Sequence, residues 1–152
     1  MAVFATACGS SAAGSKAANS PAATPSAAAS SNVTAATADF TGKPPPAGAI
    51  VMTMANFMIN PSLPIGAGSR IVFYVDNKDP STGGCDDPYN TCHLHGLLVL
   101  GPGGTLLGKT EDVLPGHQAV LTLDGIRPGT YRFYCPVLDH RFVGMAGQLT
   151  VN

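Results

Sequence analysis

Residues 129–151 read GTYRFYCPVLDHRFVGMAGQLTV and decide the fold of the chain. The stretch opens with Thr130 to Tyr134, a run rich in aromatic and β-branched residues, and closes with Ala146 to Val151, a second run of strand length. The segment between them carries Cys135, His140 and Met145, with four residues between successive members. The stretch therefore predicts two strands joined by a loop that presents a thiol, an imidazole and a thioether.

These three side chains form most of a soft metal site. Copper that cycles between two oxidation states suits a thiolate and two imidazoles in a trigonal arrangement, with a weak, long axial methionine. The loop lacks only the second imidazole. His93 and His95 stand at the start of the apolar run Cys92 to Val99, which can lie beside the loop as a strand. We expect one of these two histidines to complete the set.

The rest of the chain from Ala49 onward also reads as strands. No stretch shows the 3.6-residue periodicity of an amphipathic helix. Short apolar runs alternate instead with turns rich in Gly, Pro, Asn and Asp, which predicts an all-β domain. The runs are Ile50 to Met58, Arg70 to Val75, Gly96 to Leu100, Ala119 to Leu123, Thr130 to Tyr134 and Ala146 to Val151.

Residues 129–136 and 145–151, together with Leu114-Pro115-Gly116 upstream, resemble the cupredoxins, in particular the sulfocyanin-like and plastocyanin-like bacterial members. The resemblance covers essentially everything after residue 48. It implies a cupredoxin Greek-key β-sandwich with one type 1 copper ion and a role in one-electron transfer. Carried over residue by residue, it makes Cys135 the thiolate ligand, His140 the imidazole at the exposed edge and Met145 the axial thioether.

The choice of the buried imidazole ligand lies between His93 and His95. Both can point inward, because residues two apart on a strand face the same side. In the family the ligand immediately precedes the apolar strand, as His95 does here, so the resemblance favours His95. His93 is then a group beside the ligand shell or at a strand end. His117 follows a Pro-Gly turn, and we expect it in a solvated loop.

The chain departs from the family between Asn77 and the histidines, where residues 78–91 form an insertion. We interpret Cys85 and Cys92 as a disulfide that closes this loop, because an exported protein meets an oxidising compartment. The alternative is a second metal site built on Cys92 and His93, which would need more ligands than the sequence places nearby.

Four acidic residues lie in or beside the same insertion. Their spacing lacks the regular ligand pattern of a calcium-binding loop. We therefore expect them to be solvated acids in turns: Asp76, Asp79, Asp86 and Asp87.

The N-terminal third differs in composition from the rest. Residues 1–8 form a short apolar segment ending in Ala5-Thr6-Ala7-Cys8, similar to a truncated signal and lipobox, which predicts lipidation of Cys8. Residues 9–48 consist mostly of Ala, Ser, Thr, Gly and Pro, and such a segment buries too little apolar surface to offset its ordering entropy. We predict a disordered tether over 9–48 and a cupredoxin domain over 49–152.

The balance of charged residues limits the classes of partner that the chain is expected to bind. The chain has 8 Lys and Arg against 9 Asp and Glu, so it offers no basic excess for nucleic acid or an anionic membrane surface.

We expect an exported monomer, lipid-anchored at the outer face of the cytoplasmic membrane or in the periplasm. We expect it to meet redox partner proteins near His140. A multicopper enzyme needs more than the 4 histidines of this chain. A mononuclear copper enzyme and a copper carrier remain as alternatives.

Overall fold

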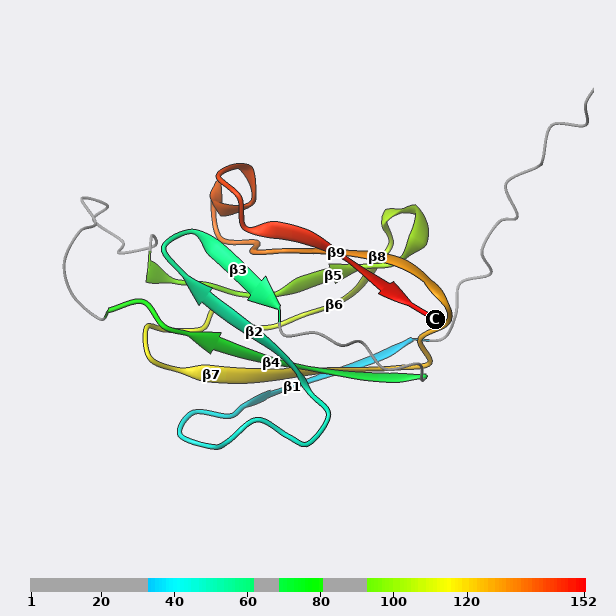
Figure 1. The fold of residues 1–152 in the computed structure, drawn as a ribbon, viewed down its shortest axis with the longest axis horizontal. Helices are drawn as coiled ribbons and strands as arrows, with labels where there is room; N and C mark the ends of the chain where they lie inside the picture. Colours follow the sequence, from blue (N-terminus) through cyan, green and yellow to red (C-terminus); the bar gives the residue numbers. More distant parts are fainter. Residues whose placement is uncertain (1–32, 62–68, 81–92) are drawn as a thin grey trace, which may run out of the picture.

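The computed structural model describes residues 33–61, 69–80 and 93–152, which fold into two facing β-sheets (Figure 1). One sheet has five strands in the order β1-β7-β4-β2-β3, and the other has four in the order β6-β5-β8-β9. The strands are β1 (Thr34–Asp39), β2 (Ile50–Ala55), β3 (Met58–Pro61), β4 (Arg70–Asn77), β5 (Leu98–Leu100), β6 (Leu106–Lys109), β7 (Gln118–Asp124), β8 (Gly129–Tyr134) and β9 (Ala146–Val151). The described residues contain no α-helix, and so none that could span a membrane.

The core lies between the sheets and follows from the alternation of side chains along each strand. In β2 every second residue is buried, beginning with Ile50, as expected for a strand with one face on the core. Met52 and Met54 from β2 are completely buried, and Phe133 from β8 is 5 % exposed. The all-β sandwich predicted from the sequence is confirmed.

Strand register gives the sandwich two distinct ends. At one end, Asp76 of β4 pairs with Gln118 of β7, and the loops that follow β4 and β8 leave the sheets there. At the other end, Arg70 and Thr34 both pair with Asp124. Val151, the last residue of β9, also lies at this second end, near the C-terminus marked in Figure 1. The candidate metal residues are all at the first end.

Strand β1 corrects the predicted boundary at residue 48. Residues 34–39 were expected in a disordered tether, but they pair antiparallel with β7 over their whole length. All six are exposed, so the strand is held by its backbone hydrogen bonds at the edge of the sheet and not by buried side chains. The prediction from composition was wrong here because composition indicates how much apolar surface a segment can bury, whereas β1 is held by backbone pairing and buries no side chain. Residues 1–32, with the predicted lipidation site Cys8, lie outside the described part of the chain.

The run expected as one strand from Ile50 to Met58 is a hairpin. It breaks at Asn56 and Phe57, which have positive φ angles of 49° and 58°, and β3 then pairs back on β2. Two positive φ angles at the central residues are typical of the two-residue turn of a β-hairpin, where glycine is preferred at the second position. Phe57 in that position places a large aromatic ring at the end of the sandwich that carries the metal residues.

Candidate metal centre

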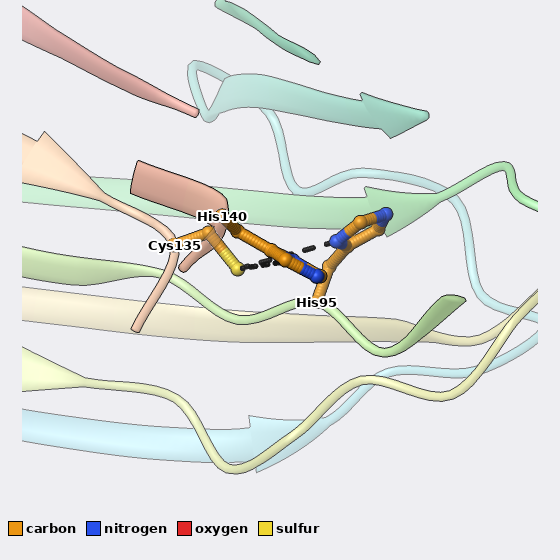
Figure 2. Close-up of side chains that lie close together, drawn as sticks. All are labelled: His95, Cys135 and His140. Atoms are coloured by element: carbon orange, nitrogen blue, oxygen red, sulfur yellow. Dashed lines mark hydrogen bonds between the residues drawn. The ribbon is translucent and has the colours of Figure 1, made fainter. Parts of the chain in front are cut away.

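Three donor side chains from two parts of the chain converge at one end of the sandwich (Figure 2). The ligand atoms of His95, Cys135 and His140 all lie within 4.8 Å of one another. The Cys135 Sγ is 3.5 Å from His140 Nδ1 and 4.0 Å from His95 Nδ1. All three side chains are buried, with exposed fractions of 0 % for His95 and Cys135 and 4 % for His140.

The loop after β8 is held closed by its own backbone. The Cys135 N–H donates to the Met145 carbonyl at 2.9 Å, which joins the two ends of the loop. The Met145 N–H in turn donates to the His140 carbonyl at 3.1 Å. Leu138, between Cys135 and His140, has a φ of 37°, a left-handed conformation that leucine rarely adopts. The short connection that brings the two donors together is therefore held with local backbone strain.

Met145 lies at the end of this loop and is completely buried. Its backbone contacts with both Cys135 and His140 place it next to the donor group. Its role as an axial thioether ligand stays a prediction from the sequence.

His95 comes from the opposite side of the group, just before β5. Its N–H donates to the Val113 carbonyl at 3.2 Å, and its carbonyl accepts from the Val113 N–H at 2.6 Å, so the backbone is paired in both directions. Of the two histidines considered, it is His95 whose ring nitrogen faces Cys135. His93 is also buried, but it lies outside this donor group, with its Nδ1 3.8 Å from a carboxylate oxygen of Asp79. His117 is exposed, as expected.

Burial shifts the proton affinity of all three donors. Loss of hydration lowers the pKa of His95, although its hydrogen bond to Asp79 works in the opposite direction. Loss of hydration also lowers the pKa of His140, and the neighbouring His95 lowers it further. The same effect raises the pKa of the Cys135 thiol. Without a metal the site thus favours two neutral imidazoles and a protonated thiol, so a metal that binds the thiolate must displace that proton.

The sequence analysis did not recognise the roles of two buried polar residues near the donor group, Asp79 and Asn77. The acids expected in solvated turns include Asp76 and Asp79, yet these are only 8 % and 6 % exposed. Asp79 Oδ2 lies 2.7 Å from His95 Nε2, so this carboxylate contacts a donor residue directly. Asn77 is completely buried and donates from Nδ2 to the carbonyls of His93 and Val113, each at 2.8 Å. No local signal in the sequence marks either residue, because both act through partners distant in the chain.

The remaining predictions for the insertion fall on residues that the structure does not describe. These are the disulfide between Cys85 and Cys92, the alternative metal site on Cys92, and the turn positions of Asp86 and Asp87. Within the described ranges, Cys135 is the one free cysteine.

The donor set fits copper. A thiolate and two imidazoles arranged around one point are the ligands of a trigonal type 1 copper site, and a buried methionine stands nearby. Zinc also accepts such donors, but structural zinc sites are usually closed by four strong ligands, and only three are grouped among the described residues.

Several solved structures share the fold of this chain. Auracyanin from Roseiflexus castenholzii superposes with a TM-score of 0.54 at 18 % identity, covering 68 % of this chain and 96 % of the auracyanin. Auracyanin B gives a TM-score of 0.55 at 17 % identity over 78 % of this chain and 97 % of that one. Amicyanin from Paracoccus versutus gives 0.51 at 16 % identity, covering 80 % and 99 %. All of these are cupredoxins.

At the level of sequence, no family profile matches the chain. A multicopper oxidase from Staphylococcus haemolyticus and one from Staphylococcus epidermidis are each 34 % identical over 91 residues. The match covers 53 % of this chain and 20 % of each oxidase, so the chain spans about a fifth of the length of these relatives. The two-sheet architecture and the likeness to auracyanin and amicyanin show that this chain has the cupredoxin fold, and the buried His-Cys-His group indicates copper binding.

Proposed function

We propose that this protein is a one-electron carrier built on a type 1 copper centre, with His95, Cys135, His140 and Met145 as the ligands. The observation that carries the proposal is the buried convergence of two histidine Nδ1 atoms on one cysteine sulfur. Copper bound there supplies a couple that gains and loses a single electron. The likeness to auracyanin and amicyanin in fold adds support.

The chain's own contribution is to hold the donors still. Fast one-electron transfer needs little change in geometry between the two oxidation states, so a carrier benefits from ligands whose positions are fixed beforehand. Here the Cys135 loop is closed by its bond to Met145, and the His95 backbone is paired in both directions with Val113. A buried, apolar setting also excludes water from the metal, which disfavours binding of small molecules.

Exposed apolar residues surround His140 beside the charged Asp139 and Arg141, and we propose this surface as the docking site for redox partner proteins. Leu138, Phe142 and Val143 are 68 %, 70 % and 61 % exposed, and all three lie within three residues of His140. Val137, on the other side of Leu138, is buried in the core. We therefore assign the three exposed residues to docking and Val137 to packing, and we propose that electrons enter or leave through the His140 edge.

We also propose that the protein works as a monomer outside the cytoplasm, anchored through a lipid on Cys8. The basis is the lipobox-like segment at residues 5–8, which precedes the described part of the chain. Recovery of the protein in the membrane fraction, and its release when Cys8 is replaced by serine, would support the anchor. A protein that stays in the soluble fraction with Cys8 intact would contradict it.

The function is tested by loading the full chain with Cu(II) and recording its visible and electron paramagnetic resonance spectra, followed by voltammetry. A carrier gives an intense thiolate-to-copper absorption, narrow copper hyperfine splitting and a reversible one-electron wave. A colourless protein with an ordinary tetragonal copper signal would contradict a type 1 centre.

The similarity to multicopper oxidases favours a second candidate, an oxidase-type copper enzyme. The two candidates are separated by oxygen consumption with a reducing substrate. An electron carrier is reduced once and then stops, whereas an oxidase turns over repeatedly.

A further inference from the structure

Asp79 makes the shortest side-chain contact to a donor residue in the described part of the site. Its Oδ2 lies 2.7 Å from His95 Nε2, on the side of the ring away from Cys135. The side chain of Asp79 is 3 % exposed and that of His95 is 0 % exposed, so water does not compete for this hydrogen bond. A carboxylate beside a buried imidazole ligand is a strong, charge-assisted acceptor.

The carboxylate is itself fixed at several points. Its Oδ1 accepts the Asn56 N–H at 2.8 Å, and the Asp79 N–H donates to Asn77 Oδ1 at 3.0 Å. Both carboxylate oxygens are therefore occupied, one by the backbone of the β2–β3 turn and one by the ring of His95. The position of Asp79 is thus determined by the fold and not by the metal.

This arrangement determines which ring nitrogen of His95 carries the proton. An ionised carboxylate can only accept hydrogen bonds, so the 2.7 Å contact requires the hydrogen on Nε2. The Nδ1 atom then keeps its lone pair, and this is the atom that faces the Cys135 sulfur. The acceptor therefore keeps the ring in the tautomer and the orientation that a metal needs.

The carboxylate also adds a negative charge next to the centre. Among the described residues, the side chains that could carry a positive charge within 4.0 Å of the Asp79 carboxylate are the rings of His95 and, at 3.8 Å, His93, and no lysine or arginine lies that close. Its charge is therefore not neutralised by a permanent cation. A nearby anion stabilises the more positive, oxidised form of a metal centre over the reduced form.

We propose that Asp79 is a positioning residue that fixes the Nε2–H tautomer of His95 and, through its charge, lowers the reduction potential of the bound copper. The second half of this proposal rests on the proposed function, whereas the first half concerns the protein with or without metal.

The test is Asp79→Asn, which keeps the shape and removes the charge. An asparagine has one oxygen for two donors, the Asn56 N–H and the His95 Nε2–H. One of the two donors must therefore face the new NH₂ group. If that donor is His95, the ring is driven toward the Nδ1–H tautomer, which must move its proton to Nε2 before Nδ1 can bind a metal. The matched control is Asp76→Asn, which removes the same charge from a residue paired with Lys78 and Gln118.

The first readout is nitrogen-15 NMR of the histidine rings in the metal-free protein above pH 7. We expect His95 as Nε2–H in the parent and in the Asp76 variant, with Nδ1–H gained in the Asp79 variant. An Nδ1–H tautomer in the parent overturns the assignment without any variant. If the Asp79 variant does not fold, Asp79→Ser provides a smaller neutral replacement.

The second readout is the reduction potential of the copper-loaded proteins. At a fixed applied potential we expect the ratio of reduced to oxidised copper to rise about tenfold or more in the Asp79 variant, equivalent to about 59 mV for one electron. An unchanged potential, or an equal rise in the Asp76 control, overturns the charge effect. A parent protein without a type 1 spectrum overturns the proposed function and the charge effect together, while the NMR result still decides the tautomer.

Discussion

The two halves of the metal centre are built in different ways. The loop half, residues 135–145, supplies Cys135, His140 and the predicted axial ligand Met145 from one short segment that also carries exposed apolar side chains. The scaffold half supplies His95 and surrounds it with Asp79 and Asn77, which are buried and come from a distant part of the chain. The comparison shows that donors close together in the sequence can come from one loop, whereas the orientation of His95 depends on hydrogen bonds to residues distant in the chain.

Removal of the Cys135 thiol should have the largest effect on the copper centre, because the sulfur faces the histidine donors of both halves. Cys135→Ser replaces a thiolate with a weak hydroxyl ligand, so we expect complete loss of the intense visible absorption. Circular dichroism should show that the β-sandwich persists, since serine is of similar size. An absorption that survives the change would remove Cys135 from the site.

The scaffold half should respond most strongly in stability. Asn77→Ala removes three buried hydrogen bonds, those to the carbonyls of His93 and Val113 and the one from the N–H of Asp79. A lost hydrogen bond costs about 0.5–1.5 kcal/mol, so we expect unfolding of the metal-free protein to become easier by about 2 kcal/mol or more. The measurement is urea unfolding, with Asn60→Ala on the exposed face of β3 as the control. A loss below about 1 kcal/mol would contradict the role given to this network.

Acid should weaken the metal-free protein through the two histidines. Burial holds the folded pKa values of His95 and His140 below the usual histidine value of about 6.5. His95 lowers the pKa of His140 further, whereas Asp79 and Asp139 act in the opposite direction. The unfolded chain therefore binds more protons, and stability that is complete above pH 6.5 falls as the pH drops toward the folded pKa values. The slope is at most about 1.4 kcal/mol per pH unit for each histidine.

Urea midpoints between pH 7 and pH 5 measure this slope. His140→Gln should reduce it, because one of the two titrating groups is gone. A stability that stays level or rises over this interval would show that the histidines are not held neutral.

The smallest effect on stability should come from the exposed part of the loop half. Phe142 is 70 % exposed, so Phe142→Ser should change the unfolding free energy by no more than about 0.5 kcal/mol. If the surface around His140 docks redox partners, electron exchange should still slow several-fold. Leu106→Ser, at a leucine on β6 that is 54 % exposed, is the control and should leave the rate unchanged. Equal rates in all three proteins would contradict docking at His140.

The sequence predicts the loop half well because its information is local. Fixed spacing between Cys135, His140 and Met145, flanked by two strand-like runs, is enough to predict a strand pair with donors in its loop. The scaffold half escapes such reasoning. Asp79 looks like any polar residue in a turn, and only the pairing of β4 with β2 and β7 brings it to His95.

The unusual hairpin turn at Asn56 and Phe57 also belongs to the surroundings of the metal centre. Glycine is the usual residue at the second turn position, and Phe57 occupies it at a cost in backbone strain. The ring of Phe57 packs edge-on against His140 at 4.9 Å between centroids, and the Asn56 N–H holds Asp79. A turn that breaks its own residue preference thus contacts both halves of the centre.

Strand β1 gives the molecule a polarity. Its first residue, Thr34, pairs with Asp124 at the end of the sandwich opposite the metal residues, and the C-terminal strand finishes at that same end. Any attachment that reaches the domain through residue 33 therefore joins it at the end of the sandwich opposite the metal residues. A molecule held in this way turns its copper end outward, with His140 and its apolar surroundings at the point farthest from whatever it is fastened to.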